Sequence, residues 1–158
     1  QIQIQISVII SQIRELSINL RPSLLDDLGI LPTLIWYFDR YEAKTGIRVC
    51  FNHQNLDQRF SPELEITASR IVQEALTNVI RHAHATHVEI ELAEADGAYL
   101  ISIADDGAGV AEGRDLSDGR GLLGIRERAE LLGGTLEVGP GKLGGLCVTV
   151  EIPVKEKP

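Results

Sequence analysis

Asp105-Asp106-Gly107-Ala108-Gly109 is the stretch that decides the fold of this chain. It follows the apolar run 99–104, so a carboxylate stands where a predicted strand ends and glycines break it. A second cluster, Gly119-Arg120-Gly121-Leu122-Leu123-Gly124, comes after a polar segment and opens a predicted helix over 122–132. Glycine lets backbone approach a ligand closely, and backbone N–H groups at a helix start attract phosphate. The first cluster therefore offers a hydrogen-bond acceptor and the second offers backbone N–H groups for a phosphate, which together indicate a nucleotide site.

Two other phosphate-binding patterns are weaker explanations of these glycines. Gly119, Gly121 and Gly124 fit G-x-G-x-x-G, but the dinucleotide fingerprint directly follows a strand and precedes an acidic residue by about 20 positions. Here the pattern follows the loop-like segment 111–118. The chain contains no G-x-x-x-x-G-K-[ST], which excludes a Walker-type P-loop.

Ser61 as N-cap and Pro62 at the first position predict the start of a helix over 62–82, and a polar stripe marks one of its faces. Glu74, Asn78 and then Arg81 or His82 recur at helical spacing on one face, and apolar residues occupy the other side. An amide oxygen is a suitable ligand for Mg²⁺, so Asn78 is the candidate metal ligand, and the cations would meet phosphate charge. A solvated polar face is the plain alternative, which the two glycine clusters make the weaker one. The histidines are not spaced like the zinc ligands of a metalloprotease.

Composition bounds the class of protein. The 158 residues support one domain with a short appendage, and 44% hydrophobic content is enough for a core. The net charge of -8 argues against nucleic-acid binding through a basic field. No apolar run is long enough to span a membrane and no basic leader is present, so we expect a cytoplasmic domain without membrane contact. Because the chain has no Met, we expect a fragment of a longer protein, whose anchoring in the cell membrane stays open.

The remaining elements predict an α/β sandwich. Apolar residues at alternating spacings of four and three along 2–20 favour a helix that packs on another helix, although 1–6 also alternates like a strand. Residues 23–29 are predicted to be a short acidic connector. Cys50 and Cys147 are predicted to be buried, reduced thiols. Further predicted elements are a helix at 31–43 ended by Gly46, strands at 47–51, 88–92, 99–104, 135–138 and 147–152, and a hairpin at Asp96-Gly97.

Taken together, these motifs resemble a known family. Residues 71–82 resemble the asparagine box of the ATP-binding domain of sensor histidine kinases, and 105–109 and 119–128 resemble its two glycine boxes. Gln73-Glu74-Ala75-Leu76-Thr77-Asn78, Arg81-His82-Ala83 and the junction-like segment 20–29 resemble the subfamily that signals to NarL-type response regulators. The resemblance extends from about residue 14 to residue 153.

The resemblance implies a Bergerat fold. This is a two-layer α/β sandwich with a mostly antiparallel mixed sheet, here preceded by an N-terminal helix from the dimerisation hairpin. It implies that residues 1–28 are a remnant of the second dimerisation helix and its linker, that 29–154 form the catalytic ATP-binding domain, and that 155–158 are a tail.

The resemblance also assigns roles in binding Mg·ATP. Asp105 would accept a hydrogen bond from the adenine amino group, and Gly107 and Gly109 would let the purine pack close. Asn78 would bind Mg²⁺, and a short lid would span 110–118. The remaining nucleotide-binding positions are Arg81, His82, Gly119, Arg120, Gly121, Leu122 and Gly124.

The implied activity is transfer of the γ-phosphoryl group to a histidine. The acceptor would lie on the dimerisation domain of the homodimeric parent, which would pass the phosphoryl group to a NarL-type response regulator. Either Glu74 or an acid beside the acceptor histidine would polarise the attacking nitrogen. Two departures stand out: no His followed by Asp or Glu is present, so the chain alone should be inactive, and Gly145 precedes Leu146 where the family has Thr.

Two other functions share this fold. An ATP-regulated switch of the anti-sigma type would bind a protein partner without phosphorylating a histidine. A conformational ATPase such as gyrase B would need additional transducer domains. The helical seam over 2–20 and the Arg21-Pro22 junction favour the kinase.

Overall fold

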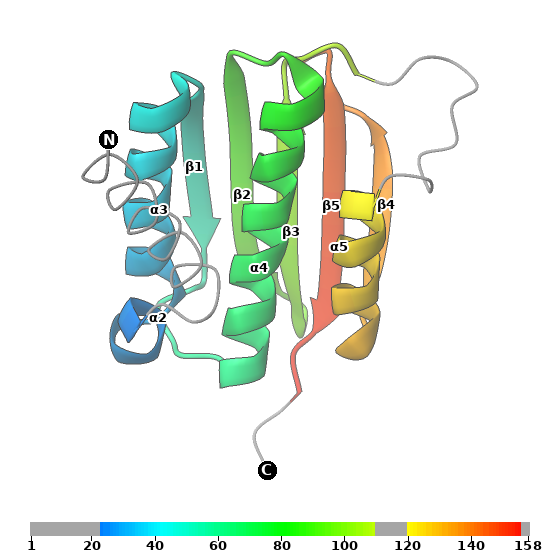
Figure 1. Cartoon of the computed structure of the whole chain (residues 1–158). Coiled ribbons are helices and arrows are strands. Elements are labelled where there is room, and N and C mark those ends of the chain that lie inside the picture. The colour runs from blue at the N-terminus through cyan, green and yellow to red at the C-terminus, as the bar shows by residue number, and fades with distance from the viewer. Residues whose placement is uncertain (1–22, 110–119, 156–158) are drawn as a thin grey trace, which may run out of the picture.

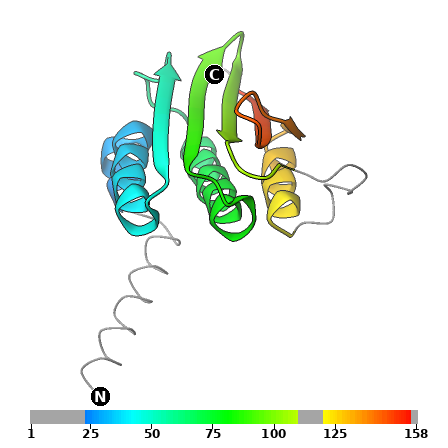
Figure 2. The same cartoon turned by 90° about the horizontal axis from the view of Figure 1, so that it is seen from above.

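The computed structural model describes residues 23–109 and 120–155, which form a mixed sheet covered on one face by helices (Figure 1). The helices are α2 (Ser23–Leu28), α3 (Ile30–Thr45), α4 (Pro62–Asn78) and α5 (Arg120–Leu131), with a π-helical turn η1 (Val79–Ala83) after α4. The strands are β1 (Arg48–Gln54), β2 (His87–Ala95), β3 (Ala98–Asp105), β4 (Thr135–Pro140) and β5 (Leu146–Pro153). Figure 2 shows the two layers edge-on, which confirms the predicted fold class.

The sheet has the strand order β1-β2-β3-β5-β4. Only the β1–β2 pair is parallel, and the other three pairs are antiparallel. A parallel pair needs a crossover, which α4 and η1 supply on the helical face. The predicted hairpin between β2 and β3 is confirmed: Asp96 and Gly97 both have positive φ, as a tight two-residue turn requires.

The core lies between the sheet and the helices. Alternate residues of β2, β3 and β5 are buried against the apolar side of α4 and α5, which explains the alternation in the sequence. The opposite face of the sheet is polar and uncovered by the described elements (Figure 2). Among the described helices, none is both long and apolar enough to cross a bilayer. The strand residues of this core are Val88, Ile90, Leu92, Tyr99, Ile101, Ile103, Val148, Val150 and Ile152.

Helix α4 begins as the sequence predicts. Ser61 caps it, accepting a hydrogen bond from the Leu64 amide at 3.3 Å, and Pro62 occupies the first turn. The prediction of one regular helix to His82 is wrong for its last turn, because the backbone widens to a π turn over 79–83. The turn ends at His84, whose φ of 51° is left-handed, and the chain then enters β2.

Two further predictions are corrected by the structure. Residues 23–28 are not a connector but helix α2, because Leu25 is buried in the core and Arg59 donates to the carbonyls of Leu25 and Asp26. The thiols are free, as predicted, but Cys50 is exposed and Cys147 half-buried, because both lie on the open face of the sheet. The helical seam over 2–20, the lid at 110–118 and most of the tail lie outside the described residues.

Candidate nucleotide site

Four segments meet at one end of the sheet, where β3 ends (Figure 1). They are the loop 106–109 after β3, the end of α4 with η1, the first turn of α5, and the loop 141–145 between β4 and β5. Glycines stand at the points where these segments touch. The two predicted glycine clusters and the polar helix are thus brought to one place.

Asp105 is a buried carboxylate at the tip of β3. It continues the buried alternation of Ile101 and Ile103, so its side chain faces the helical layer, and it is only 5% exposed. Its Oδ1 accepts from the Gly107 amide at 2.8 Å and from the Leu146 amide at 3.4 Å. Within the described residues, no hydrogen bond reaches its Oδ2. A buried carboxylate needs hydrogen-bond partners, so the second oxygen can accept from a ligand.

Gly145 packs directly on Asp105. A Cβ atom at this position would overlap Oδ1 of Asp105 and lie 2.7 Å from the Gly107 amide nitrogen. The Gly145 amide also donates to the Asp105 carbonyl at 3.1 Å. Sequence reasoning noted this position only for the missing threonine hydroxyl. The backbone amide of Leu146 still reaches Asp105, and the half-buried Leu146 side chain packs on the core.

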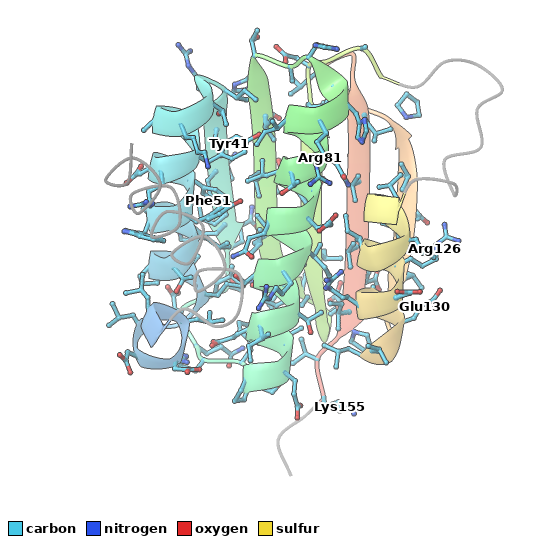
Figure 3. The ribbon with its side chains drawn as sticks, viewed as in Figure 1. Tyr41, Phe51, Arg81, Arg126, Glu130 and Lys155 are labelled. Carbon is cyan, nitrogen blue, oxygen red and sulfur yellow. The ribbon has the colours of Figure 1, made fainter. Side chains whose placement is uncertain are left out.

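Asn78 lies at the end of α4, against the first turn of α5. A Cβ atom at Gly121 would overlap the Asn78 amide group, so only glycine allows this approach. Glu74 lies one turn earlier and, like Asn78, is half-buried. The π turn changes the spacing beyond Asn78, and Arg81 and His82 are exposed on it. Figure 3 shows Arg81 at the end of α4 that lies beside the tip of β3.

Two tyrosines of α3, Tyr37 and Tyr41, lie behind the site, and the sequence analysis did not single them out. The Tyr41 hydroxyl donates to the Leu76 carbonyl of α4 at 3.1 Å. Burial raises its pKa, and the neighbouring Tyr37 and Asp105 add to the shift. Burial, followed by the charge of Glu74, raises the pKa of Tyr37 to about 12. Both phenols are therefore neutral at physiological pH, and their i, i+4 spacing was the available signal.

Lys142 is another residue that the sequence did not point to. Its ammonium group lies 3.0 Å from Glu89 and 3.7 Å from Glu91, across the open face of the sheet. The hydrogen bond with Glu89, together with the charges of both carboxylates, raises the pKa of Lys142. The pair ties the loop 141–145 to β2, although exposed ion pairs of this kind stabilise little.

The other predicted positions are placed as follows. Gly109 has a left-handed φ of 67° and lies beside Gly144. Leu122 packs on the core, and the Gly124 carbonyl accepts from Arg128 at 2.9 Å. Of Arg120 only the backbone is described, and Gly119 lies outside the described residues. Within residues 23–109 and 120–155, no group of three or more His, Cys, Asp or Glu side chains is arranged so that it could hold a metal ion.

Comparison with known proteins identifies relatives of the whole chain. Residues 63–156 match the family described as histidine kinase-, DNA gyrase B-, and HSP90-like ATPase. The chain is 38% identical over 151 residues to the oxygen sensor histidine kinase NreB of Staphylococcus carnosus, covering 95% of this chain and 44% of that protein. It is 35% identical over 145 residues to the signal transduction histidine-protein kinase/phosphatase DegS of Brevibacillus brevis, covering 92% and 38%. The chain therefore spans less than half the length of these curated relatives.

Solved structures share the fold. The blue-light activated histidine kinase of Erythrobacter litoralis EL346 aligns with a TM-score of 0.67 at 24% identity, over 79% of this chain and 42% of that one. The ATP binding domain of PrrB from Mycobacterium tuberculosis aligns with a TM-score of 0.59 at 22% identity, over 78% and 95%.

Proposed function

Because the chain belongs to the family of histidine kinase-, DNA gyrase B-, and HSP90-like ATPases, we propose that it is the catalytic ATP-binding domain of a two-component sensor histidine kinase. The observation that carries the proposal is the buried carboxylate of Asp105, held by glycine backbone on two sides. The names of the two relatives support the kinase rather than another member of the family.

In this proposal Asp105 selects the base. The adenine amino group donates to Oδ2, the oxygen that accepts no hydrogen bond from the described residues, whereas the carbonyl oxygen of guanine would be repelled there. At Gly107 and Gly145 the backbone packs directly on Ala83 and Asp105, which holds the base-binding carboxylate in place. Asp105 is only 5% exposed, and a hydrogen bond shielded from water in this way is stronger.

The phosphates would lie toward Asn78 and the first turn of α5. Mg²⁺ usually keeps several waters and takes oxygen ligands from the substrate, so one amide oxygen from the chain fits the site. When bound, the ion would neutralise charge on the phosphates. Arg81 and His82 supply further positive or donor groups on η1, and the amides that open α5 suit an anion.

The reaction is phosphoryl transfer to nitrogen. A histidine nitrogen attacks the γ-phosphorus, the bond from that phosphorus to the β–γ bridging oxygen breaks, and ADP leaves. The chain contributes mainly position and charge. Either Glu74 or an acid beside the acceptor histidine polarises the attacking nitrogen. The acceptor belongs to a dimerisation domain of the homodimeric parent, and a NarL-type response regulator receives the phosphoryl group.

The deciding experiment is a phosphotransfer assay. With γ-labelled ATP and Mg²⁺, we expect this chain to stay unlabelled and to label an added dimerisation hairpin that carries a His-Asp or His-Glu motif. None of the four histidines of this chain is followed by an acid. Acid-labile phosphate on this chain alone would contradict the proposal. ATP-dependent binding to a partner without any labelled histidine would favour the anti-sigma-type switch.

The metal role of Asn78 has a separate test. We expect Asn78→Ala to weaken binding of Mg·ATP by about tenfold or more, the equivalent of losing about 1.4 kcal/mol, and to change binding of metal-free ADP little. Titration calorimetry of both ligands measures this difference. Asn52→Ala, an exposed asparagine on the open face of β1, is the matched control. Equal losses for both ligands would remove Asn78 as the metal ligand.

A further inference from the structure

Asp106 ties the loop after β3 to the beginning of β2. Its Oδ1 accepts from the backbone amides of Thr86 at 2.8 Å and His87 at 2.9 Å, and its Oδ2 accepts from the Thr86 hydroxyl at 2.8 Å. These hydrogen bonds lower the pKa of Asp106, with that from the His87 amide the largest cause. Both oxygens are therefore engaged by the protein, in contrast to Asp105.

The neighbours of Asp106 make the same connection. The Asp106 amide donates to the His87 carbonyl at 3.1 Å, and the Ala108 amide donates to the Ala83 carbonyl at 2.8 Å. A Cβ atom at Gly107 would overlap that same Ala83 carbonyl, so the loop lies flat against it. Ala83 ends the π turn that continues α4. The loop that follows Asp105 is thus bonded to the segment that follows Asn78.

We propose that Asp106 and Thr86 are positioning residues that fix the separation between the Asp105 carboxylate and the Asn78 amide. This inference rests on the proposed function, in which one nucleotide contacts both groups. A ligand that must reach two groups binds more tightly when their separation is already set, because less ordering is needed on binding.

The role differs from base recognition in a measurable way. A residue that contacts adenine changes the preference for adenine over guanine. A residue that sets the distance between two halves of a site weakens every nucleotide that spans them. Both oxygens of the Asp106 carboxylate already accept hydrogen bonds from Thr86 and His87. Loss of this carboxylate should therefore lower the affinity for nucleotides and leave the preference for adenine over guanine unchanged.

The experiment compares Kd values for Mg·ATP and Mg·GTP by calorimetry, well below the melting temperature of each variant. We expect Asp106→Ala to raise both Kd values by about tenfold, because all three hydrogen bonds to Thr86 and His87 are lost, and Thr86→Val to raise both less. Asp106→Asn should stay close to the parent, since its carbonyl can accept from both amides and its amide can donate to the hydroxyl. Thr86→Ser keeps every contact. Asp39→Ala, an exposed aspartate of α3, is the matched control.

A second measurement needs no nucleotide. In the free chain, Asp106→Ala should speed amide exchange at Ala108 and leave Ile101 and Ile103 in β3 unchanged. If the parent chain binds no nucleotide, the proposed function fails. If the Asp106→Ala variant exchanges its Ala108 amide at the parental rate, Asp106 does not hold the loop after β3 in place. Parental Kd values in Asp106→Ala would overturn the positioning role. A changed ratio of ATP to GTP affinity, as expected for Asp105→Asn, would make Asp106 a base contact instead.

Discussion

Gly145→Ala is expected to weaken ATP binding by about a hundredfold, or about 2.7 kcal/mol. The added methyl group would overlap Oδ1 of Asp105 and crowd the Gly107 amide, so the carboxylate must leave the position that these amides hold. Forcing a methyl group into a packed region typically costs about 1–3 kcal/mol. Because the group displaced is the carboxylate that binds the base, calorimetry with Mg·ATP should detect the loss of affinity directly.

The control for this substitution is Gly139→Ala. Gly139 lies in β4, has no strained φ, and would bring its methyl group near no other atom within 4 Å. Asp105→Asn supplies a second variant without a clash, because it changes Oδ2 to a donor that faces the adenine amino group. Losing a charged hydrogen bond should cost about 1.5–3 kcal/mol. Parental affinity in both Gly145→Ala and Asp105→Asn would show that the base binds elsewhere.

Local patterns predicted the elements of this fold well. The alternation in β2, β3 and β5, the Ser61 cap and the Asp96-Gly97 turn each have a local physical cause, and each is confirmed. The connector predicted over 23–29, where the structure has a helix at 23–28, shows the limit. Its helix depends on Leu25 entering the core and on a cation from residue 59, both of which are contacts made only in the folded chain.

The site shows the same division. The sequence could nominate Asp105 and Asn78 because each stands beside a glycine cluster or on a polar helical face. It could not show that Gly121 touches Asn78 or that Gly145 touches Asp105, because these contacts join distant segments. Nor could it distinguish the two adjacent aspartates by their partners. Thr86 and Lys142 carry no motif at all, and only their geometry singles them out.

Arg59→Met is expected to lower the stability of the folded chain, because it removes the cation that pairs with a buried carboxylate. The guanidinium of Arg59 donates to both carboxylate oxygens of Glu65, at 3.1 and 3.0 Å, and Glu65 is only 2% exposed. Its Nη2 also donates to the carbonyls of Leu25 and Asp26 in α2, at 3.2 and 3.3 Å. Removing it leaves a buried carboxylate whose one remaining hydrogen-bond partner among the described residues is the Phe60 amide, at 3.2 Å. Half of the Arg59 side chain is exposed, so water limits the loss below that of a fully buried pair.

Thermal and urea unfolding measure this effect, with a fall in Tm of about 5–10 °C expected for a domain of this size. Arg126→Met is the matched control, because Arg126 is exposed on α5 and points away from the sheet (Figure 3). The double variant Arg59→Met/Glu65→Gln should recover much of the loss, since the buried charge is gone and the Phe60 amide keeps an acceptor. Because this pair lies at the end of α4 opposite Asn78, ATP affinity measured well below Tm should stay at the parental value. Unchanged stability in Arg59→Met would mean that water replaces the guanidinium at Glu65 without cost.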